Sequence, residues 1–537
     1  MKKLTIYLSA LVLGLAAVSC ESQLNIPQKS VLSYDTYYAE AGPDEADQLI
    51  AAVYRTYYSN VCSIEHNILL DVLSDDSNVG GGGASDNANS FRDAGNYIMT
   101  SSIAPPRVMY QGIYRTIYYC NSIIEKLEDG DPEIARVKAE AKFFRAICMF
   151  EAVRLWGTPP FADHLLAQDE YELPNGDPAE IIAWCLSNLQ EAADALPAIP
   201  GIGQQKAFGA RISKHAALAY KGKVALWYGS RYNDSKVLAE AMAPLKAVIS
   251  SGLYGLVDDM SILYRPAGDF CKEYIFEHNA GENDGHPGSA QNDLRPTWVG
   301  LRTENINLPD AVQGGGWGWD SPSGDFGRFL TQHDGVDGPR FRAWIATYDQ
   351  ILDMEYAPGV TPGVRVGGYF DNEGYFRLKG ILYKADLYDV PGFWRYTFTN
   401  DPYMRYSEVL LLYAEAALLN GQDQAGGLEA LNQVRQRAGL SAVSALNYQD
   451  IKDERRAELW GEQERFFDLV RWGDAATALK DKGKTWYTFL GYKAGTTEWD
   501  ISSEKGWGDG WNSKYELMPF PYAQLSANSQ LKQNPGW

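Results

Sequence analysis

Segments with helical periodicity recur along the first half of the chain, and they limit its fold more than any other feature. Apolar residues at helical spacing predict helices over residues 44–62, 107–127, 134–156, 178–196, 213–228 and 235–250. Successive helix pairs repeat every roughly 30 to 45 residues, which suggests tetratricopeptide-like stacking. Helical spacing returns over residues 404–419, 427–438 and 448–472. The chain is therefore predicted to be mostly α, with tetratricopeptide-like helix pairs as its scaffold.

Residues 255–403 interrupt this pattern. Gly, Pro, Asn, Asp, Trp and Tyr dominate there, so we expect long loops with a few short strands. Loops of this length in a compact protein usually carry function. We accordingly divide the body into a helical scaffold over 31–254, a loop-rich region over 255–403 and a helical C-terminal part over 404–537. A second stretch, 484–515, is also expected to be irregular.

The first thirty residues are predicted to be an export signal and a tether. Lys2 and Lys3 precede an apolar run over 4–18, which is shorter than the roughly 20 residues of a membrane-spanning helix and typical of a signal peptide. Small residues then lead to Cys20, which predicts a signal peptide over 1–19, a lipid on Cys20 and a tether over 20–30. Ordinary secretion with a coincidental cysteine is the alternative, because Ala17 stands where Leu is usual.

Composition excludes several classes of function. Forty-eight basic and 69 acidic residues give a formal charge of -21, which disfavours nucleic-acid binding. The five cysteines after Cys20 are far apart and odd in number, so neither a disulfide framework nor a zinc site is expected. No catalytic motif is present, and no cofactor is predicted. Bound calcium stays open, as does a metal between His278 and His286, which bracket a loop rich in Asn, Asp and Gly.

Acidic residues inside the C-terminal helices are predicted to form an internal salt-bridge network. Glu408 and Glu415 are seven residues apart within an apolar helical segment, so they share one helical face. Buried carboxylates need partners. The sequence offers Arg435, Arg437, Arg455, Arg456, Arg465 and Arg471.

Several motifs, in this order and spacing, resemble the SusD/RagB family of Bacteroidetes outer-membrane lipoproteins. They are AEAKFFRA (139–146) running to RLWGTP (154–159), SKHAALAYKGKVAL (213–226), MRYSEVLLLYAEA (404–416), LNQVRQRAGL (431–440), ERRAEL (454–459), ERFFDLVRWG (464–473), PFP (519–521) and QNPGW (533–537). The resemblance covers nearly the whole chain. Phe520 stands where Ile is common, and Trp537 stands where another aromatic such as Tyr is usual.

The resemblance implies a SusD-like fold and a role in nutrient uptake. It implies a lipoprotein displayed on the outer membrane that captures oligosaccharides without catalysis. It also implies delivery of the glycan to a SusC-type TonB-dependent outer-membrane transporter, over which the protein closes as a lid. A peptide-uptake or adhesion lipoprotein on the same scaffold is the alternative. A glycoside hydrolase is less favoured, because 69 acidic residues place some carboxylate pair at the required separation by chance.

A sugar site needs flat aromatic rings beside hydrogen-bonding side chains. The segment Gly314–Asp320 offers Trp317 and Trp319 among glycines, followed by Asp320, and extended backbone would place both rings on one side. The resemblance implies that a similar segment lies near the family's glycan face. Further candidates are Trp298, Arg295, Asp75, Asp76, Asn78, Tyr369, Tyr383, Trp394 and Arg395. Packing between loops is the alternative for each, and it is favoured for Trp486, Trp499, Trp507 and Trp511.

Overall fold

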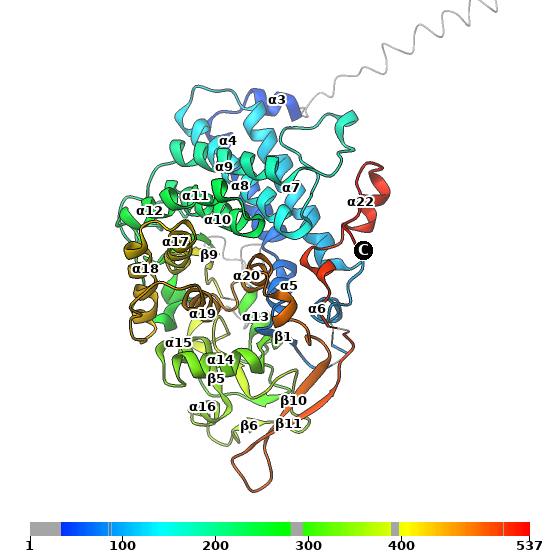
Figure 1. Cartoon of the computed structure of the whole chain (residues 1–537), viewed down its shortest axis with the longest axis vertical. Helices are drawn as coiled ribbons and strands as arrows, with labels where there is room; N and C mark the ends of the chain where they lie inside the picture. The colour runs from blue at the N-terminus through cyan, green and yellow to red at the C-terminus, as the bar shows by residue number, and fades with distance from the viewer. Residues whose placement is uncertain (1–33, 84, 87, 281–293, 388–396, 509) are drawn as a thin grey trace, which may run out of the picture.

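Helices of the first half pack against one another, and most of them form the upper part of the molecule (Figure 1). The computed structural model describes residues 34–83, 85–86, 88–280, 294–387, 397–508 and 510–537. The helices of this part are α3 (Tyr34–Ala39), α4 (Pro43–Thr56), α5 (Ile64–Val72), α6 (Asn89–Gly95), α7 (Ala104–Lys126), α8 (Pro132–Trp156), α9 (Pro178–Ala195), α10 (Lys214–Tyr232), α11 (Ser235–Ala239) and α12 (Met242–Ser250). Helices α5 and α6 lie at mid-height in Figure 1. Each helix from α7 to α10 contacts its successor, as in stacked helix pairs. The predicted mostly α fold is confirmed.

Helix α8 lies at the centre of this array and is buried over most of its length, including charged residues such as Glu140 and Arg154. The side chain of Asp131 accepts a hydrogen bond from the backbone N–H of Glu133 at 2.8 Å, and Pro132 occupies the first turn. Gly157 ends the helix with a φ of +70°. Helices α4, α7 and α9 all contact α8 and enclose it.

Helices of the C-terminal part continue the array. They are α17 (Tyr406–Asn420), α18 (Gln424–Arg437), α19 (Tyr448–Glu458), α20 (Arg465–Trp472), α21 (Ala475–Ala478) and α22 (Tyr522–Ala527). Helix α17 packs against α10, α12 and α18. The single helix predicted over 448–472 is wrong: Gly461, with a φ of +72°, lies in the break between α19 and α20. The helix predicted over 235–250 is likewise divided into α11 and α12.

The loop-rich region forms the lower part of the molecule in Figure 1 and contains short helices as well as strands. Its elements are β2 (Tyr274–His278), α13 (Arg295–Val299), β3 (Ile306–Asn307), β4 (Trp319–Pro322), α14 (Gly324–Asp334), α15 (Pro339–Trp344), β5 (Ile345–Thr347), α16 (Tyr348–Leu352), β6 (Gly363–Val364), β7 (Tyr369–Phe370), β8 (Tyr375–Arg377) and β9 (Asp401–Arg405). Antiparallel pairs join β2 with β9, β3 with β6, and β5 with β8.

Strand β1 (Ser77–Gly80) connects the helical scaffold to the loop-rich region. It pairs antiparallel with β4, so that Gly80 lies opposite Trp319. The polar and glycine-rich sequence of residues 74–83 predicts a flexible loop, which is wrong for residues 77–80 because they pair with β4. No local sequence pattern marks this strand, because it forms by pairing with β4, which lies far along the chain.

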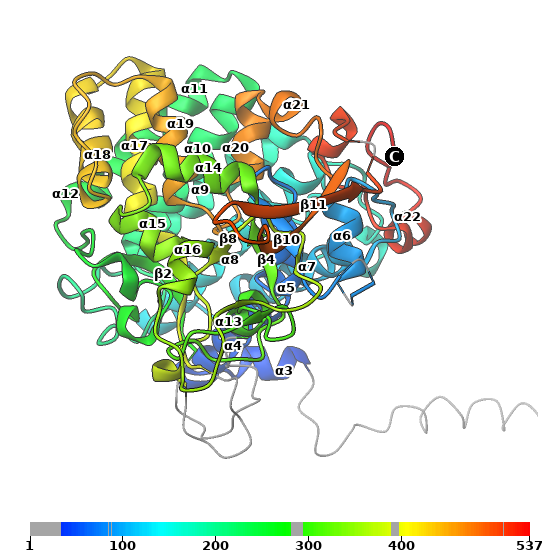
Figure 2. The ribbon, with the colours of Figure 1, turned by 90° about the horizontal axis from the view of Figure 1, so that it is seen from below.

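The stretch 484–515, expected to be irregular, contains a β-hairpin. Strands β10 (Thr485–Tyr492) and β11 (Trp499–Lys505) pair antiparallel, and β7 pairs with the other edge of β10. Figure 2 shows the hairpin lying across the molecule when it is viewed from below. Trp, Tyr and Phe favour β-strands, but the glycines around them led to the prediction of irregular structure.

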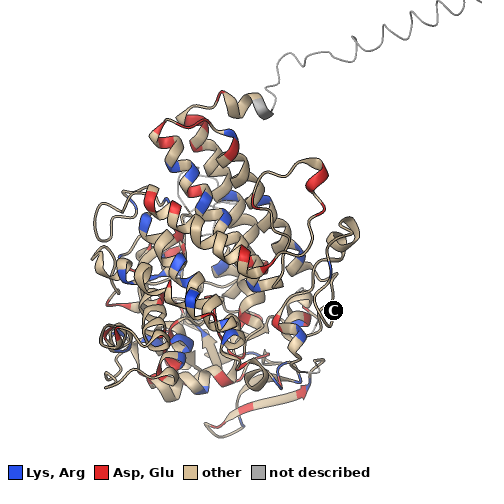
Figure 3. Cartoon of the chain, turned by 45° about the horizontal axis from the view of Figure 1, so that its top comes forward, with Lys and Arg blue, Asp and Glu red and all other residues tan. Residues whose placement is uncertain are grey.

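The predicted salt-bridge network is present, with one change of partner. Arg471 Nη2 lies 2.7 Å from Glu415 Oε2, and Arg437 Nη1 lies 2.9 Å from Glu273 Oε2. Glu408 pairs with Lys223 at 2.9 Å rather than with an arginine. Figure 3 shows acidic and basic residues interleaved along the helices. These charges therefore join helices of the scaffold to one another.

Two further expectations concern cysteines and membrane segments. The free cysteines Cys62, Cys120, Cys148 and Cys185 are buried, whereas Cys271 is half-buried. Within the described residues, no helix combines the length and apolar character needed to cross a membrane. Residues 1–33, including Cys20, lie outside the described residues.

Candidate functional site

The glycine-rich segment before β4 brings Trp317 and Trp319 into contact. Their ring centroids are 4.8 Å apart and their planes meet at 62°, an edge-to-face pair. Trp319 is 7% exposed and packs on Phe91 of α6 at 5.6 Å. Trp317 is half-buried. The two rings are therefore not parallel platforms: Trp319 supports from within, and Trp317 presents the accessible ring.

Glycines make this arrangement possible. Gly318 has a φ of +72°, so the segment is not regular extended backbone. A Cβ on Gly316 would lie 2.2 Å from the carbonyl carbon of Gly300, which shows how closely the segment packs against the end of α13. On the other side, a Cβ on Gly81 would lie 3.2 Å from the Trp319 indole. Side chains at these positions would push the ring pair away from its supports.

The backbone of Trp317 is joined to α13 at Thr297, the residue before Trp298. The backbone N–H of Trp317 donates a hydrogen bond to the carbonyl of Thr297 at 2.8 Å. Trp298 is half-buried, as Trp317 is. The backbones at two of the predicted aromatic residues thus lie close together, and each residue has part of its surface accessible.

Three predicted ligand-binding residues have internal partners instead. Arg295 is 4% exposed and forms an ion pair with Asp401. Asp320, with a φ of +52°, forms an ion pair with Arg377 inside the protein. Tyr369 is 2% exposed, and its hydroxyl accepts a hydrogen bond from the backbone N–H of Arg302 at 3.4 Å. In this conformation these side chains hold the loops together, and a ligand does not reach them.

Other candidates fall at the margins of the site. Asn78 of β1 is half-buried and donates to the carbonyl of Asp371 at 3.2 Å. Tyr383 is half-buried, with the Arg265 guanidinium 4.3 Å from the centre of its ring. Trp394 and Arg395 lie outside the described residues, and so does His286.

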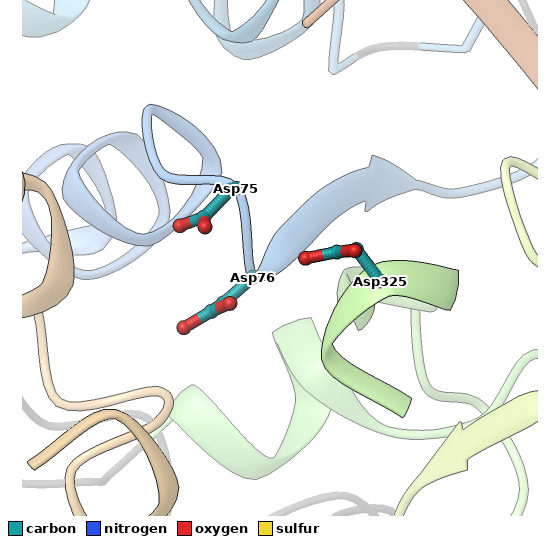
Figure 4. Close-up of side chains that lie close together, drawn as sticks. All are labelled: Asp75, Asp76 and Asp325. Atoms are coloured by element: carbon teal, nitrogen blue, oxygen red, sulfur yellow. The ribbon is translucent and has the colours of Figure 1, made fainter. Parts of the chain in front are cut away.

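Asp75 and Asp76 lie close to Asp325 of α14 (Figure 4), and the ligand atoms of the three are all within 4.8 Å of one another. Arg456 Nη2 lies among them, at 2.6 Å from Asp76 Oδ1 and 2.7 Å from Asp325 Oδ2. Its guanidinium occupies the space that a metal ion would need. We therefore assign these carboxylates to an ion-pair cluster.

A second arginine completes the cluster. Arg465 binds Asp75 through two hydrogen bonds of 2.9 and 2.8 Å. Burial favours protonation of Asp75, but Arg465 and Arg456 outweigh it and hold the pKa of Asp75 well below its usual range. Burial raises the pKa of Asp76 to about 6, against the lowering effect of Arg456. Asp75 is thus an anion at neutral pH, and both of its carboxylate oxygens accept hydrogen bonds from Arg465.

Trp507 is the residue that the sequence analysis placed wrongly. It was grouped with packing aromatics, and yet its side chain is 52% exposed, whereas Trp486 is 5% exposed. Trp499 and Trp511 are half-buried. A signal was available, because glycine flanks Trp507 on both sides, as it does Trp317.

Two family models match the chain. A model described as the SusD family matches residues 272–537, and one described as starch-binding associating with outer membrane matches residues 45–226. A SusD-like protein of Formosa agariphila is 25% identical over 517 residues, which covers 86% of this chain and 89% of that protein.

Solved structures agree over most of the chain. A laminarin-binding SusD-like protein has a TM-score of 0.72 and 26% identity, with 92% of this chain and 99% of that chain covered. A SusD homologue from Bacteroides thetaiotaomicron has a TM-score of 0.73 and 21% identity, with coverages of 93% and 98%. The second likeness concerns the fold alone.

Proposed function

The chain belongs to the SusD family, and from that membership we propose that it is an outer-membrane glycan-binding protein that captures oligosaccharides without changing them. The observation that carries this proposal is the partly accessible Trp317, whose ring is supported edge-on by Trp319 and whose backbone N–H donates a hydrogen bond to Thr297 of α13. Sugars present apolar C–H faces to such rings and hydroxyls to neighbouring polar groups. The similarity to a laminarin-binding SusD-like protein supports a glycan as ligand.

The electrostatics of the nearby carboxylates support binding rather than hydrolysis. A glycosidase needs one carboxylic acid that keeps its proton and a second carboxylate at a defined distance from it. Arg465 pairs with Asp75 and Arg456 pairs with Asp76, so both carboxyl groups are held in ion pairs inside the protein. The two arginines hold the pKa of Asp75 well below its usual range, which makes Asp75 a poor proton donor. Burial raises the pKa of Asp76, but its carboxyl group is held by Arg456.

The membrane anchor and the transporter are further parts of the proposal. The description of the second family model, which includes association with the outer membrane, supports the location. A lipid on Cys20 would tether the protein on the cell surface. A SusC-type TonB-dependent transporter would receive the glycan, with the helical scaffold as the contact surface and the aromatic loops facing the ligand.

Trp317→Ala tests the binding site. Calorimetry would measure binding of a panel that contains laminarin and starch to the wild-type protein and the variant. A stacking ring contributes on the order of 1 kcal/mol to binding. We therefore expect the variant to bind about fivefold to tenfold more weakly to the polysaccharide that the wild-type protein binds.

Tyr522→Ala is the matched control, because Tyr522 is a 64% exposed aromatic on α22, and its affinity should equal that of the wild type. Equal affinity of Trp317→Ala and wild type would remove Trp317 from the site. Binding of peptides and of no glycan would favour the peptide-uptake alternative.

A further inference from the structure

Trp507 differs from the other tryptophans in how it is held. Among the tryptophans that the structure describes, it alone is exposed, at 52%. Its neighbours Gly506 and Gly508 are buried, and their backbone N–H groups donate to the carbonyls of Lys484 and Gly483, both at 2.9 Å. The backbone on both sides of the indole is thus fixed while the ring projects outward.

Trp486 fixes the orientation of this ring from below. The centroids of Trp507 and Trp486 are 4.4 Å apart, and their planes meet at 69°. Trp486 is 5% exposed, and its Nε1 donates to Asn96 Oδ1 at 3.2 Å. An accessible ring supported edge-on by a buried tryptophan is the arrangement already seen at Trp317 and Trp319.

Polar groups lie next to this aromatic pair. A cavity of about 20 Å³ adjoins Trp486 and is lined mainly by hydrogen-bonding side chains. These are Asn78, Arg92, Asn96, Asp371, Lys482 and Thr485. These side chains hydrogen-bond within the protein, as Asn96 does with Trp486 and Asn78 with Asp371, and they hold the surroundings of the aromatic pair in place.

Helix α6 stands between the two accessible tryptophans. Phe91 of α6 contacts Trp319, which supports Trp317. The next residue, Arg92, stacks over Phe370 at 5.4 Å, and Phe370 contacts Trp486 at 5.9 Å. A continuous chain of packed side chains therefore links the two rings and fixes their separation.

We propose that Trp507 forms a second sugar-binding position, so that the protein takes a polysaccharide or long oligosaccharide that contacts both Trp317 and Trp507. This inference rests on the proposed function and adds the class of ligand to it. Two positions joined by a rigid element would bind a long chain more tightly than either position binds alone.

The test is the affinity of laminarin, or of the panel polysaccharide that binds the wild type, for Trp507→Ala, Trp317→Ala and the double variant. We expect Trp507→Ala to weaken binding about fivefold or more, and the double variant to show roughly the product of the two single effects, because the rings contact different sugars. Trp507→Tyr keeps a flat ring and should retain most of the affinity. Tyr522→Ala is again the control.

The outcomes distinguish failure of the second sugar-binding position from failure of the proposed function. If Trp507→Ala binds a polysaccharide as the wild type does, the second position is wrong and the proposed function stands. A double variant no weaker than the weaker single variant would show that the rings act at one position. If the wild type binds no polysaccharide, both the proposed function and the second position fail.

Discussion

At the residue scale, Asp269 and Glu277 are two buried carboxyl groups that both accept hydrogen bonds from Asn400, Asp269 from its backbone N–H and Glu277 from its side chain. Glu277 Oε2 accepts hydrogen bonds from the Asn400 side chain at 2.8 Å and the Phe270 N–H at 3.1 Å. Its other oxygen, Oε1, is buried without a hydrogen-bond partner. Burial raises the pKa of Glu277 to about 7. Burial, and then the charge of Glu277, raise the pKa of Asp269 to about 8.

These carboxyl groups should make the protein less stable as the pH rises. Because the folded pKa of Glu277 lies above its unfolded value of 4.5, the folded state keeps a proton that the unfolded state has released. The contribution to stability is fully present below the unfolded pKa and is lost as the pH rises to the folded pKa. The unfolding free energy of the wild type should fall between pH 5 and pH 8. We predict that this fall is smaller in Glu277→Gln, by roughly a few kcal/mol.

Urea unfolding of wild type and variant at both pH values would measure this. Glu128→Gln, at an exposed position, is the control and should leave the pH dependence of the wild type unchanged. A Glu277→Gln protein that loses as much stability as the wild type over this range would contradict the assignment.

Individual site residues could be predicted from the sequence only in part. The glycines around Trp317 indicated an accessible ring, and the structure leaves Trp317 half-buried. The sequence could not show that Arg295 pairs with Asp401, because the partner lies far along the chain. Charged side chains in a loop-rich segment look available for a ligand until the fold supplies their counter-ions.

At the element scale, the ion pair between Asp75 and Arg465 joins the turn before β1 to helix α20. Both side chains are largely buried, with 11% and 14% of their surfaces exposed. Removing one partner of such a pair leaves an uncompensated charge, at a cost of about 3 kcal/mol or more. We predict that Asp75→Asn and Arg465→Met each lower the unfolding free energy by about 3 kcal/mol, and that the double variant loses less than the sum.

A double-mutant cycle by urea unfolding would measure the coupling. The exposed pair Lys384 and Asp310, 2.8 Å apart, is the control and should couple by less than about 1 kcal/mol. Simple additivity at Asp75 and Arg465 would mean that the pair does not join the two elements.

Elements with a strong local period were predictable, and elements defined by distant partners were not. Helices α7, α8 and α9 were predicted to within a few residues because apolar residues repeat within each segment. Strand β1 pairs with β4 from another region of the chain, and β10 pairs with both β11 and β7. Those pairings depend on the folded scaffold, which local patterns do not describe.

At the scale of the whole molecule, the helical array carries a loop-rich face whose aromatic residues are held by buried neighbours. The SusD-like fold was predictable because motifs occur in order along nearly the whole chain, and solved structures with TM-scores of 0.72 and 0.73 share the arrangement. The binding face was less predictable, since exposure of an aromatic ring depends on what packs around it. Trp507 is the example, because its sequence surroundings also fit a packing role.

The most direct test of the central claim is one titration of laminarin and the other panel polysaccharides into the purified mature protein, followed by chromatography of the recovered glycan. The account predicts saturable heat with at least one polysaccharide and recovery of that polysaccharide at its original length, because the protein binds without catalysis. Shortened products would show a hydrolase, and the absence of saturable binding to every glycan would contradict the proposed function.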